Sequence, residues 1–257
     1  MPTAADPTQL LLGRGKMYFD RFDSLGNPQG LRFVGEADKL EITPSATTKD
    51  YFSMTKAAST KMAQNITQQT HEIAIQMREF SAANLAIALL GDSVVLVQTQ
   101  QTIAAEQLTA KAIPGYVYQT AFRNISAVTA KSGSTALVAG TDYEIEDATL
   151  GLIHVLPGST ILTGTQPLSL AYTAAAITAR TQVQAGKESM IQRKLVYVST
   201  PANGPAYDAE VWNVRFQPSG ALALITDDYG TIPLKGEAMD SSATHPTQPL
   251  YRLTLRQ

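Results

Sequence analysis

Residues of the types that do chemistry are few in this sequence and lie far apart. The three histidines are His71, His154 and His245, and each falls on a strand-like or terminal segment. None has a second histidine or a carboxylate at the spacing of a helical metal site. Cysteine is absent, which excludes disulfides, a thiolate nucleophile and cysteine-ligated metals. We expect each histidine to be a surface or sheet-face residue.

Residues 13–16, Gly-Arg-Gly-Lys, resemble a fragment of a phosphate-binding loop. The upstream glycine of that motif is missing, and Met17 stands where Ser or Thr would coordinate magnesium. The two glycines are better explained as points where an N-terminal arm bends into the first strand.

Four acidic residues, Asp142, Glu144, Glu146 and Asp147, lie close together in the sequence. Strand alternation puts the first three on one face, which we expect to be solvated; weak cation binding is the alternative. No G-x-S-x-G nucleophile motif occurs. The sequence therefore predicts neither an enzyme nor a cofactor site.

The composition argues against two further classes of protein, nucleic-acid binders and membrane proteins. The net charge is −2, and charged residues make up 16% of the chain, below the roughly 25% of typical soluble domains. A tight nucleic-acid binder would need a basic stripe, which the chain lacks. The N-terminus has no signal-peptide pattern, and no apolar run approaches the ~18 residues that span a bilayer. We expect no membrane partner and a location in the cytoplasm of the producing cell until assembly or lysis.

Changes in pattern divide the chain into three parts. Residues 1–13 predict an irregular arm. Residues 14–96 and 178–257 predict one discontinuous β-sandwich core. Residues 97–177 are rich in small residues and hold five strand candidates, near 116, 126, 144, 154 and 170, which indicate an inserted β domain. The alternative is one continuous large sandwich.

One segment predicts an α-helix. Residues 81–90 are rich in Ala and Leu, with Ser81 as N-cap and Gly91 at the C-terminal glycine position. Leu85 and Leu89 make an apolar stripe that should pack on a sheet.

A polar segment, residues 45–62, lies between strands at 39–43 and 70–78. It is far longer than the usual hairpin loop of about 2–5 residues, and long loops in compact domains are commonly functional. We expect an arm that reaches a partner subunit, a solvated loop being the alternative. The residues expected to make this contact are Lys49, Asp50, Tyr51, Phe52, Met54 and Lys56.

The strands of the predicted core are two-faced. Period-2 alternation places Leu40, Ile42, Ile73, Ile75, Ile232 and Leu234 on the apolar side. On the last long strand we expect Trp212, Val214 and Phe216 to share one face, opposite Val211, Asn213 and Arg215. The polar side suits the wall of a wide, water-filled β-ring. Its residues are Lys39, Glu41, Glu72, Gln76, Arg78, Lys235 and Glu237.

Taken in order, these segments resemble the major tail tube proteins of long-tailed bacteriophages. The resemblance covers residues 14–95 and 178–240. The segments that carry it are 15–20, 33–42, the long segment with Lys49-Asp50-Tyr51, the strand 69–79, the helix 81–90, and the closing runs 212–220 and 230–238. Residues 140–145 and 151–153 also look like a module common in phage structural proteins.

The resemblance implies a β-sandwich/barrel tail-tube fold with one flanking helix. It implies hexameric rings that stack into a tube, with the long loop reaching the next ring and a lumen that passes DNA without binding it specifically. The implied partners are further copies of the chain, the tape-measure protein, and the tail terminator and baseplate proteins. The implied location is the virion tail. The inserted domain is expected on the outer surface, because the lumen must stay open.

Three other classes remain as alternatives. A terminator, baseplate or sheath-like component would also form rings. An adhesive β-sandwich would need an aromatic-rich concave face, whereas only 7% of the residues are aromatic and they are scattered. An enzyme would need a nucleophile–base pair or a metal cluster, which the sequence does not offer.

Overall fold

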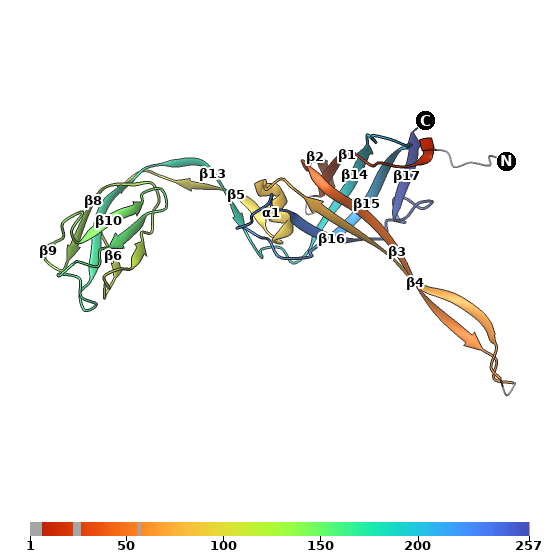
Figure 1. Ribbon diagram of the computed structural model, residues 1–257, viewed down its shortest axis with the longest axis horizontal. Helices are drawn as coiled ribbons and strands as arrows, with labels where there is room; N and C mark the ends of the chain where they lie inside the picture. The colour runs from red at the N-terminus through yellow and green to blue at the C-terminus, as the bar shows by residue number, and fades with distance from the viewer. Residues whose placement is uncertain (1–6, 23–26, 56–57, 257) are drawn as a thin grey trace. The chain divides into compact units, whose positions relative to one another are not determined.

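The computed structural model describes residues 7–22, 27–55 and 58–256. Within these ranges the chain is mainly β with one α-helix, as predicted (Figure 1). It divides into two compact units. The first takes the residues up to Ser93 and from Val183 onward, and the second is Val94–Gln182.

The first unit contains eight of the described strands, one short 3-10 helix, η1 (Pro7–Gln9), and the helix α1 (Ala82–Ala88). Its strands are β1 (Gly15–Phe22), β2 (Pro28–Phe33), β3 (Ala37–Phe52), β4 (Lys61–Met77), β14 (Ile191–Ser199), β15 (Ala206–Pro218), β16 (Ile232–Ala238) and β17 (Tyr251–Arg256).

The second unit has seven strands among the described residues. They are β6 (Gln101–Thr109), β7 (Val117–Gln119), β8 (Ile125–Ser132), β9 (Thr135–Ala136), β10 (Tyr143–Asp147), β11 (Leu152–Val155) and β12 (Leu168–Ala174). Two further strands, β5 (Asp92–Gln98) and β13 (Ile177–Gln184), run across the two unit boundaries and pair with each other.

The strands of the first unit form one antiparallel sheet in the order β2-β1-β14-β15-β16-β4-β3, with β17 paired to the first half of β15. The outermost strands of this order, β2 and β3, follow each other in the chain and are separated only by residues 34–36. At this corner the Val34 amide donates to the Met17 carbonyl (3.0 Å), and the Arg78 amide donates to the Glu36 carbonyl (2.8 Å). The sheet therefore curls strongly around its core, although no pairing among the described strands closes it into a barrel.

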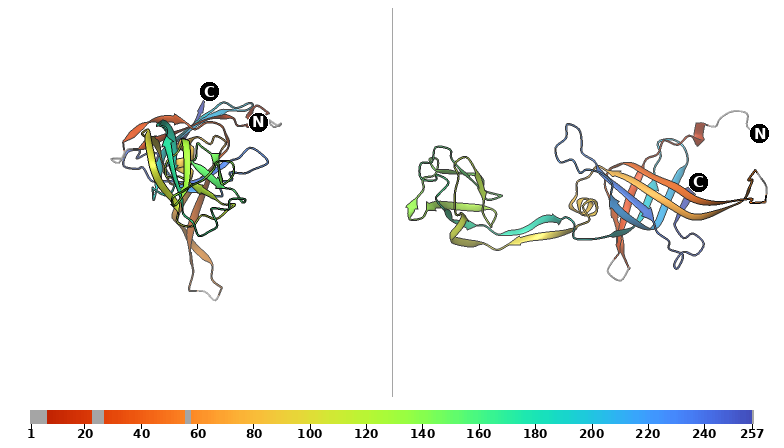
Figure 2. Two further views of the ribbon diagram at one scale, coloured as in Figure 1. Left: turned by 90° about the vertical axis from the view of Figure 1, so that its left-hand side faces the viewer. Right: turned by 90° about the horizontal axis from the view of Figure 1, so that it is seen from below.

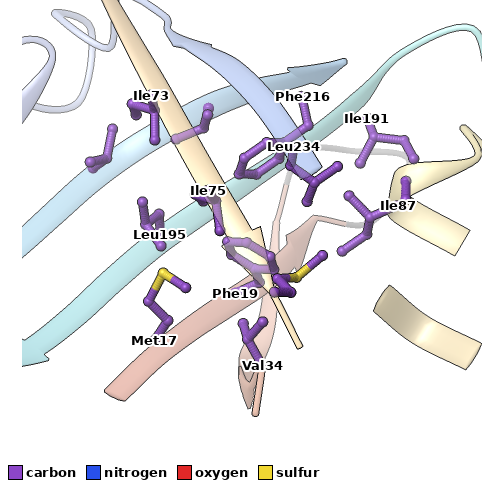
Figure 3. Close-up of a cluster of buried hydrophobic side chains, with 14 of the residues drawn as sticks. Met17, Phe19, Val34, Ile73, Ile75, Ile87, Ile191, Leu195, Phe216 and Leu234 are labelled. Carbon is purple, nitrogen blue, oxygen red and sulfur yellow. The ribbon is translucent and has the colours of Figure 1, made fainter. Parts of the chain in front are cut away.

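The core of this unit fills the inside of the curled sheet, and Figure 3 shows its side chains converging from β1, β4, β14, β15, β16 and α1. Burial of such large apolar side chains is the main favourable term in folding. The alternation expected for β4 and β16 is confirmed. Its fully buried members are Ile73, Ile75, Met77, Ile232 and Leu234.

The predicted helix is confirmed, and so is its N-cap. The Ser81 hydroxyl accepts a hydrogen bond from the Asn84 amide (3.3 Å). At the C-terminus the left-handed conformation falls on Leu90, at φ 48°. Gly91 serves a different purpose, since a Cβ there would lie 2.2 Å from the Gln184 carbonyl oxygen. The glycine lets the chain that leaves for the second unit pass directly beside the chain that returns.

The expected faces of β15 are wrong at Trp212 and Val211. The pairing with β14 shifts by one residue between Arg193 and Leu195, so that Arg193 faces Val214 while Leu195 faces Val211. Such a bulge reverses the alternation on one side of it. Val211 is therefore fully buried in the core, and Trp212 lies outside the core cluster.

The second unit has its own core between two small sheets, β6-β12-β8-β9 and β10-β11-β7. All five strand candidates are present, as β7, β8, β10, β11 and β12. The expected solvated acidic face is wrong at Asp142, which is buried. Its carboxylate accepts hydrogen bonds from the Ser159 hydroxyl and the Val138 amide, both at 2.9 Å. Burial is tolerated here because these donors satisfy the carboxylate.

The described end of the N-terminal arm is tied to the first unit rather than irregular. The Leu12 amide donates to the Asn203 carbonyl, and the Ala202 amide donates to the Leu12 carbonyl, both at 3.0 Å. Gly15, predicted to be a bend, begins β1 beside the ring of Tyr197. A Cβ on residue 15 would lie 2.5 Å from a carbon of that ring, so the close contact requires glycine.

Candidate assembly surfaces

Strands β3 and β4 form a hairpin that continues far beyond the sheet. Strand β16 accompanies β4 only over Glu72–Met77. From there outward, within the part of the chain that the structure describes, residues 44–52 pair only with residues 61–71. The hairpin leaves the sheet as a two-stranded arm in Figure 1 and in both views of Figure 2. At ~3.3 Å per residue the arm extends about 30 Å.

The predicted irregular loop over residues 45–62 is therefore wrong, because most of it is regular strand. Threonine and other β-formers occur along both strands, and glycine is absent from the segment. The Lys61 ammonium lies 2.8 Å from the Asp50 carboxylate. Farther back along the arm, the Thr67 hydroxyl donates to the Thr47 carbonyl at 3.1 Å. The ladder continues to the Ser53 amide, which donates to the Thr60 carbonyl at 2.8 Å.

Large apolar side chains stand exposed on this arm. Tyr51 is 60% exposed and Met54 85%. Met62 and Ile66 on the return strand are also exposed. They are not predicted from the sequence, because this segment is assigned there to a loop, in which strand alternation has no meaning. The other predicted contact residues in the described range, Lys49, Asp50 and Phe52, are exposed as well, and Lys56 lies outside the described residues.

An exposed arm of this kind is poorly stabilised by the chain itself. A lone two-stranded ribbon is marginal in water, and exposed apolar clusters commonly mark interaction sites. The arm therefore has the features of a surface that a second molecule covers.

The predicted polar face of the sheet is one continuous surface. Register places Glu72 opposite Glu237, and Gln76 opposite Lys39, with the core residues Ile73 and Ile75 pointing the other way. The residues of this face on β3, β4 and β16 are Lys39, Glu41, Glu72, Gln76, Lys235 and Glu237.

Four of the five charged residues of this face on the three strands form ion pairs with one another. The Lys235 ammonium lies 2.7 Å from the Glu72 carboxylate, and the Lys39 ammonium lies 2.9 Å from Glu41. A shallow hollow of about 220 Å³ beside Glu72 and Lys235 is lined almost entirely by polar residues. The surface is therefore polar and close to neutral.

Arg78 lies just beyond the end of β4. Its guanidinium contacts the Asp38 carboxylate at 2.6 Å and donates to the Tyr229 carbonyl at 2.9 Å. The hydrogen bond to Asp38 raises the pKa of Arg78 above its usual value. This predicted wall residue thus also holds the loop that precedes β16.

The histidines are not brought together. His71 contacts the Tyr251 hydroxyl at 3.1 Å, and His154 contacts the Glu144 carboxylate at 3.1 Å. His245 stacks on Trp212 with ring centroids 3.8 Å apart. In the described ranges, no group of three or more His, Asp or Glu residues could hold a metal ion. Nor does any helix in the described part of the chain have the length and apolar character to cross a bilayer.

Comparison with protein families matches residues 10–249 to one family, described as Protein of unknown function UCP028589. The match runs through both units and includes the arm. Comparison with curated proteins found no match.

Proposed function

The chain belongs to this family of unknown function, and from that premise we propose that it is the structural subunit of a phage tail tube. In this proposal the subunits form rings, of six copies as in the proteins that the chain resembles, and the rings stack into a conduit for DNA. The chain works without enzymatic activity or a cofactor. It assembles in the host cytoplasm and resides in the tail of the virion.

One observation carries the proposal, namely the β3–β4 arm. It projects from a well-packed sheet and exposes Tyr51, Phe52 and Met54, and none of the other described strands pairs with it. Contact with a neighbouring ring would bury these side chains and complete the stabilisation that the ribbon lacks alone.

The polar face of the sheet supports the second half of the proposal. A conduit for DNA must not attract phosphates strongly, since each neutralised phosphate adds affinity by counterion release. The paired charges Lys235–Glu72 and Lys39–Glu41 leave little net positive charge on this face. We propose that this face lines the lumen. The expected partners of the whole protein in the tail, besides further copies of itself, are the tape-measure, terminator and baseplate proteins.

Electron microscopy of the purified protein tests the proposal. The wild-type chain is expected to form hollow tubes, whereas a variant without the arm should stay folded and form none. Register allows a clean excision, because Thr47 faces Gln68. Residues 48–67 are replaced by Asn-Gly, which makes a two-residue hairpin turn between them.

Each result has a definite reading. Tubes of normal length from the excised variant would overturn the role of the arm. A wild-type chain that sediments as a monomer at every concentration would overturn the tube itself. Single rings that never stack would favour a terminator-like component instead.

A further inference from the structure

Three arginines meet on the core side of the sheet, at the end where α1 lies. Arg21 on β1 faces Arg193 on β14, and Arg32 on β2 faces Phe19. Phe19 is a core residue two positions before Arg21, so all three arginines share its face. Like charges placed directly opposite on neighbouring strands repel each other.

The structure compensates these charges only in part: Glu188 and Asp20 attract Arg193, which also donates to the Gln192 carbonyl at 2.8 Å, and Glu79 attracts Arg32. Arg21 lies 4.0 Å from Asp92, which also contacts Lys187 at 3.4 Å. Among the described residues, no carboxylate forms an ion pair with Arg32 or Arg193 within 4.0 Å. Burial, followed by repulsion from Arg21 and Arg32, lowers the pKa of Arg193 to about 10.

Arg32 is nevertheless held in place. It donates to the side-chain oxygen of Asn84 on α1 at 2.7 Å. Asn84 is fully buried, and its amide nitrogen donates to the carbonyls of Val34 (2.8 Å) and Glu79 (2.9 Å). A fully satisfied buried amide is a rigid support for the guanidinium beside it.

The arginines open into a cavity of about 1100 Å³ in the first unit. Its wall combines these charges with apolar side chains, among them Phe19, Ile87 and Met190. Trp212, the only tryptophan of the chain, also lines it. A matching occupant would carry carboxylates and apolar groups side by side.

The chain itself has such a segment in the loop over residues 219–231, between β15 and β16. Leu224 is 80% and Ile225 97% exposed, and the acidic Asp227 and Asp228 follow at once. Arg78 holds the Tyr229 carbonyl at 2.9 Å, which fixes the end of the loop over β4 and leaves its tip in solvent.

We propose that the loop 219–231 of a second copy of this chain docks in the arginine cavity. Its aspartates pair with Arg193 and Arg32, while Leu224 and Ile225 cover the apolar part of the wall. This inference rests on the proposed function in one respect, namely that copies of the chain associate with one another. Polyphosphate is the less fitting occupant, because it has no apolar groups to cover the apolar part of the wall.

The test is a titration of the dilute full-length chain with a peptide of residues 219–231, followed by Trp212 emission. The peptide contains no tryptophan. The wild-type chain should give a saturable change in Trp212 emission.

Arg193→Glu and Arg193→Gln should weaken peptide binding by a factor of about ten or more, since a charge pair in a desolvated site is lost. A peptide with Asp227→Lys and Asp228→Lys should bind the Arg193→Glu chain more tightly than it binds the wild-type chain. Lys131→Glu in the second unit is the matched control.

The same exchange can be made within one chain. Arg193→Glu alone should impair association, and adding Asp227→Lys and Asp228→Lys should restore it, which a mere folding defect would not allow. No response to the peptide, an equal response from Arg193→Glu, or a response only to inorganic phosphate or a short DNA duplex would overturn the inference. Wild-type tubes without peptide binding would leave the tube proposal standing, and peptide binding without tubes would leave only the docking site.

Discussion

The two ends of the β3–β4 hairpin belong to the same strands and differ in almost everything else. At the base, Ile73 and Ile75 are buried in the core and β16 runs alongside. In the arm, the same ladder of backbone hydrogen bonds continues with no third described strand beside it, and the side chains from Pro44 to Phe52 are all exposed.

This difference separates pairing from packing. Backbone hydrogen bonds exchange water partners for protein partners and contribute little net stability each, whereas buried apolar area contributes most of it. The base is therefore stable by itself, whereas the arm has little packing of its own; under the proposed function it gains that packing from a neighbouring subunit. The comparison predicts that changes at the base act on folding, while changes in the arm act on assembly.

The largest effect should come from truncating the base. Ile75 is 1% exposed and lies between Leu40 and Leu234. Ile75→Ala should lower the free energy of unfolding by about 2–5 kcal/mol, from lost burial and the cavity left behind. Ile66→Ala in the arm, where the side chain is 57% exposed, should change it by less than about 0.5 kcal/mol. Urea unfolding measures both, and equal losses would remove the distinction between base and arm.

A tyrosine in the arm should show the opposite pattern. Tyr51→Ala should leave urea unfolding unchanged and weaken tube formation by a factor of about ten or more, as expected for a buried aromatic anchor at an interface. Tyr116→Ala in the second unit is the matched control, because Tyr116 is 59% exposed and Tyr51 60%. Tube yield against concentration, measured by sedimentation, gives the comparison. If both variants assemble alike, the arm is not the contact.

The sequence predicts the base well because its signals are local. Alternation in β4 and β16 identified the buried side chains, and Ser81 with Gly91 bounded the helix within two residues. The reversed face at Trp212 could not be predicted, since a bulge depends on register with the partner strand β14.

The arm and the arginine cavity show a second limit of sequence reasoning. A polar segment without apolar alternation reads as loop, although it becomes strand when its two halves pair. Arg21, Arg32 and Arg193 lie on three strands, and only register brings them together. The buried Asn84 was missed for the same reason, because its partners Val34 and Arg32 are distant in sequence.

A second two-stranded ribbon, β5 with β13, sharpens the comparison because it leads to a unit with its own core. The chain leaves and returns at adjacent points, since the Glu188 amide donates to the Leu90 carbonyl at 2.8 Å. Replacing residues 94–182 by Gly-Ser-Gly should therefore preserve cooperative unfolding of the first unit. Tubes should still form and be narrower if the second unit lies outside the wall. A variant that no longer folds would show that the two units depend on each other.

The smallest effect on folding is expected on the polar face. Glu72 is partly exposed and pairs with Lys235 at 2.7 Å, and surface pairs of this kind contribute only about 0–1 kcal/mol. Glu72→Lys should therefore lower the free energy of unfolding by no more than about 1 kcal/mol, partly through repulsion from Lys235.

The effect of Glu72→Lys on the affinity for DNA should be larger, because a ring repeats the new charge in every subunit and each cation adds salt-dependent affinity for phosphate. Filter binding of short DNA to assembled tubes should rise at low salt and return to the wild-type level at high salt. Glu72→Gln is the matched control, since it removes the carboxylate without adding a cation, and it should raise DNA binding less. If Glu72→Lys tubes bind no more DNA than wild type at low salt, this face of the sheet does not line the channel.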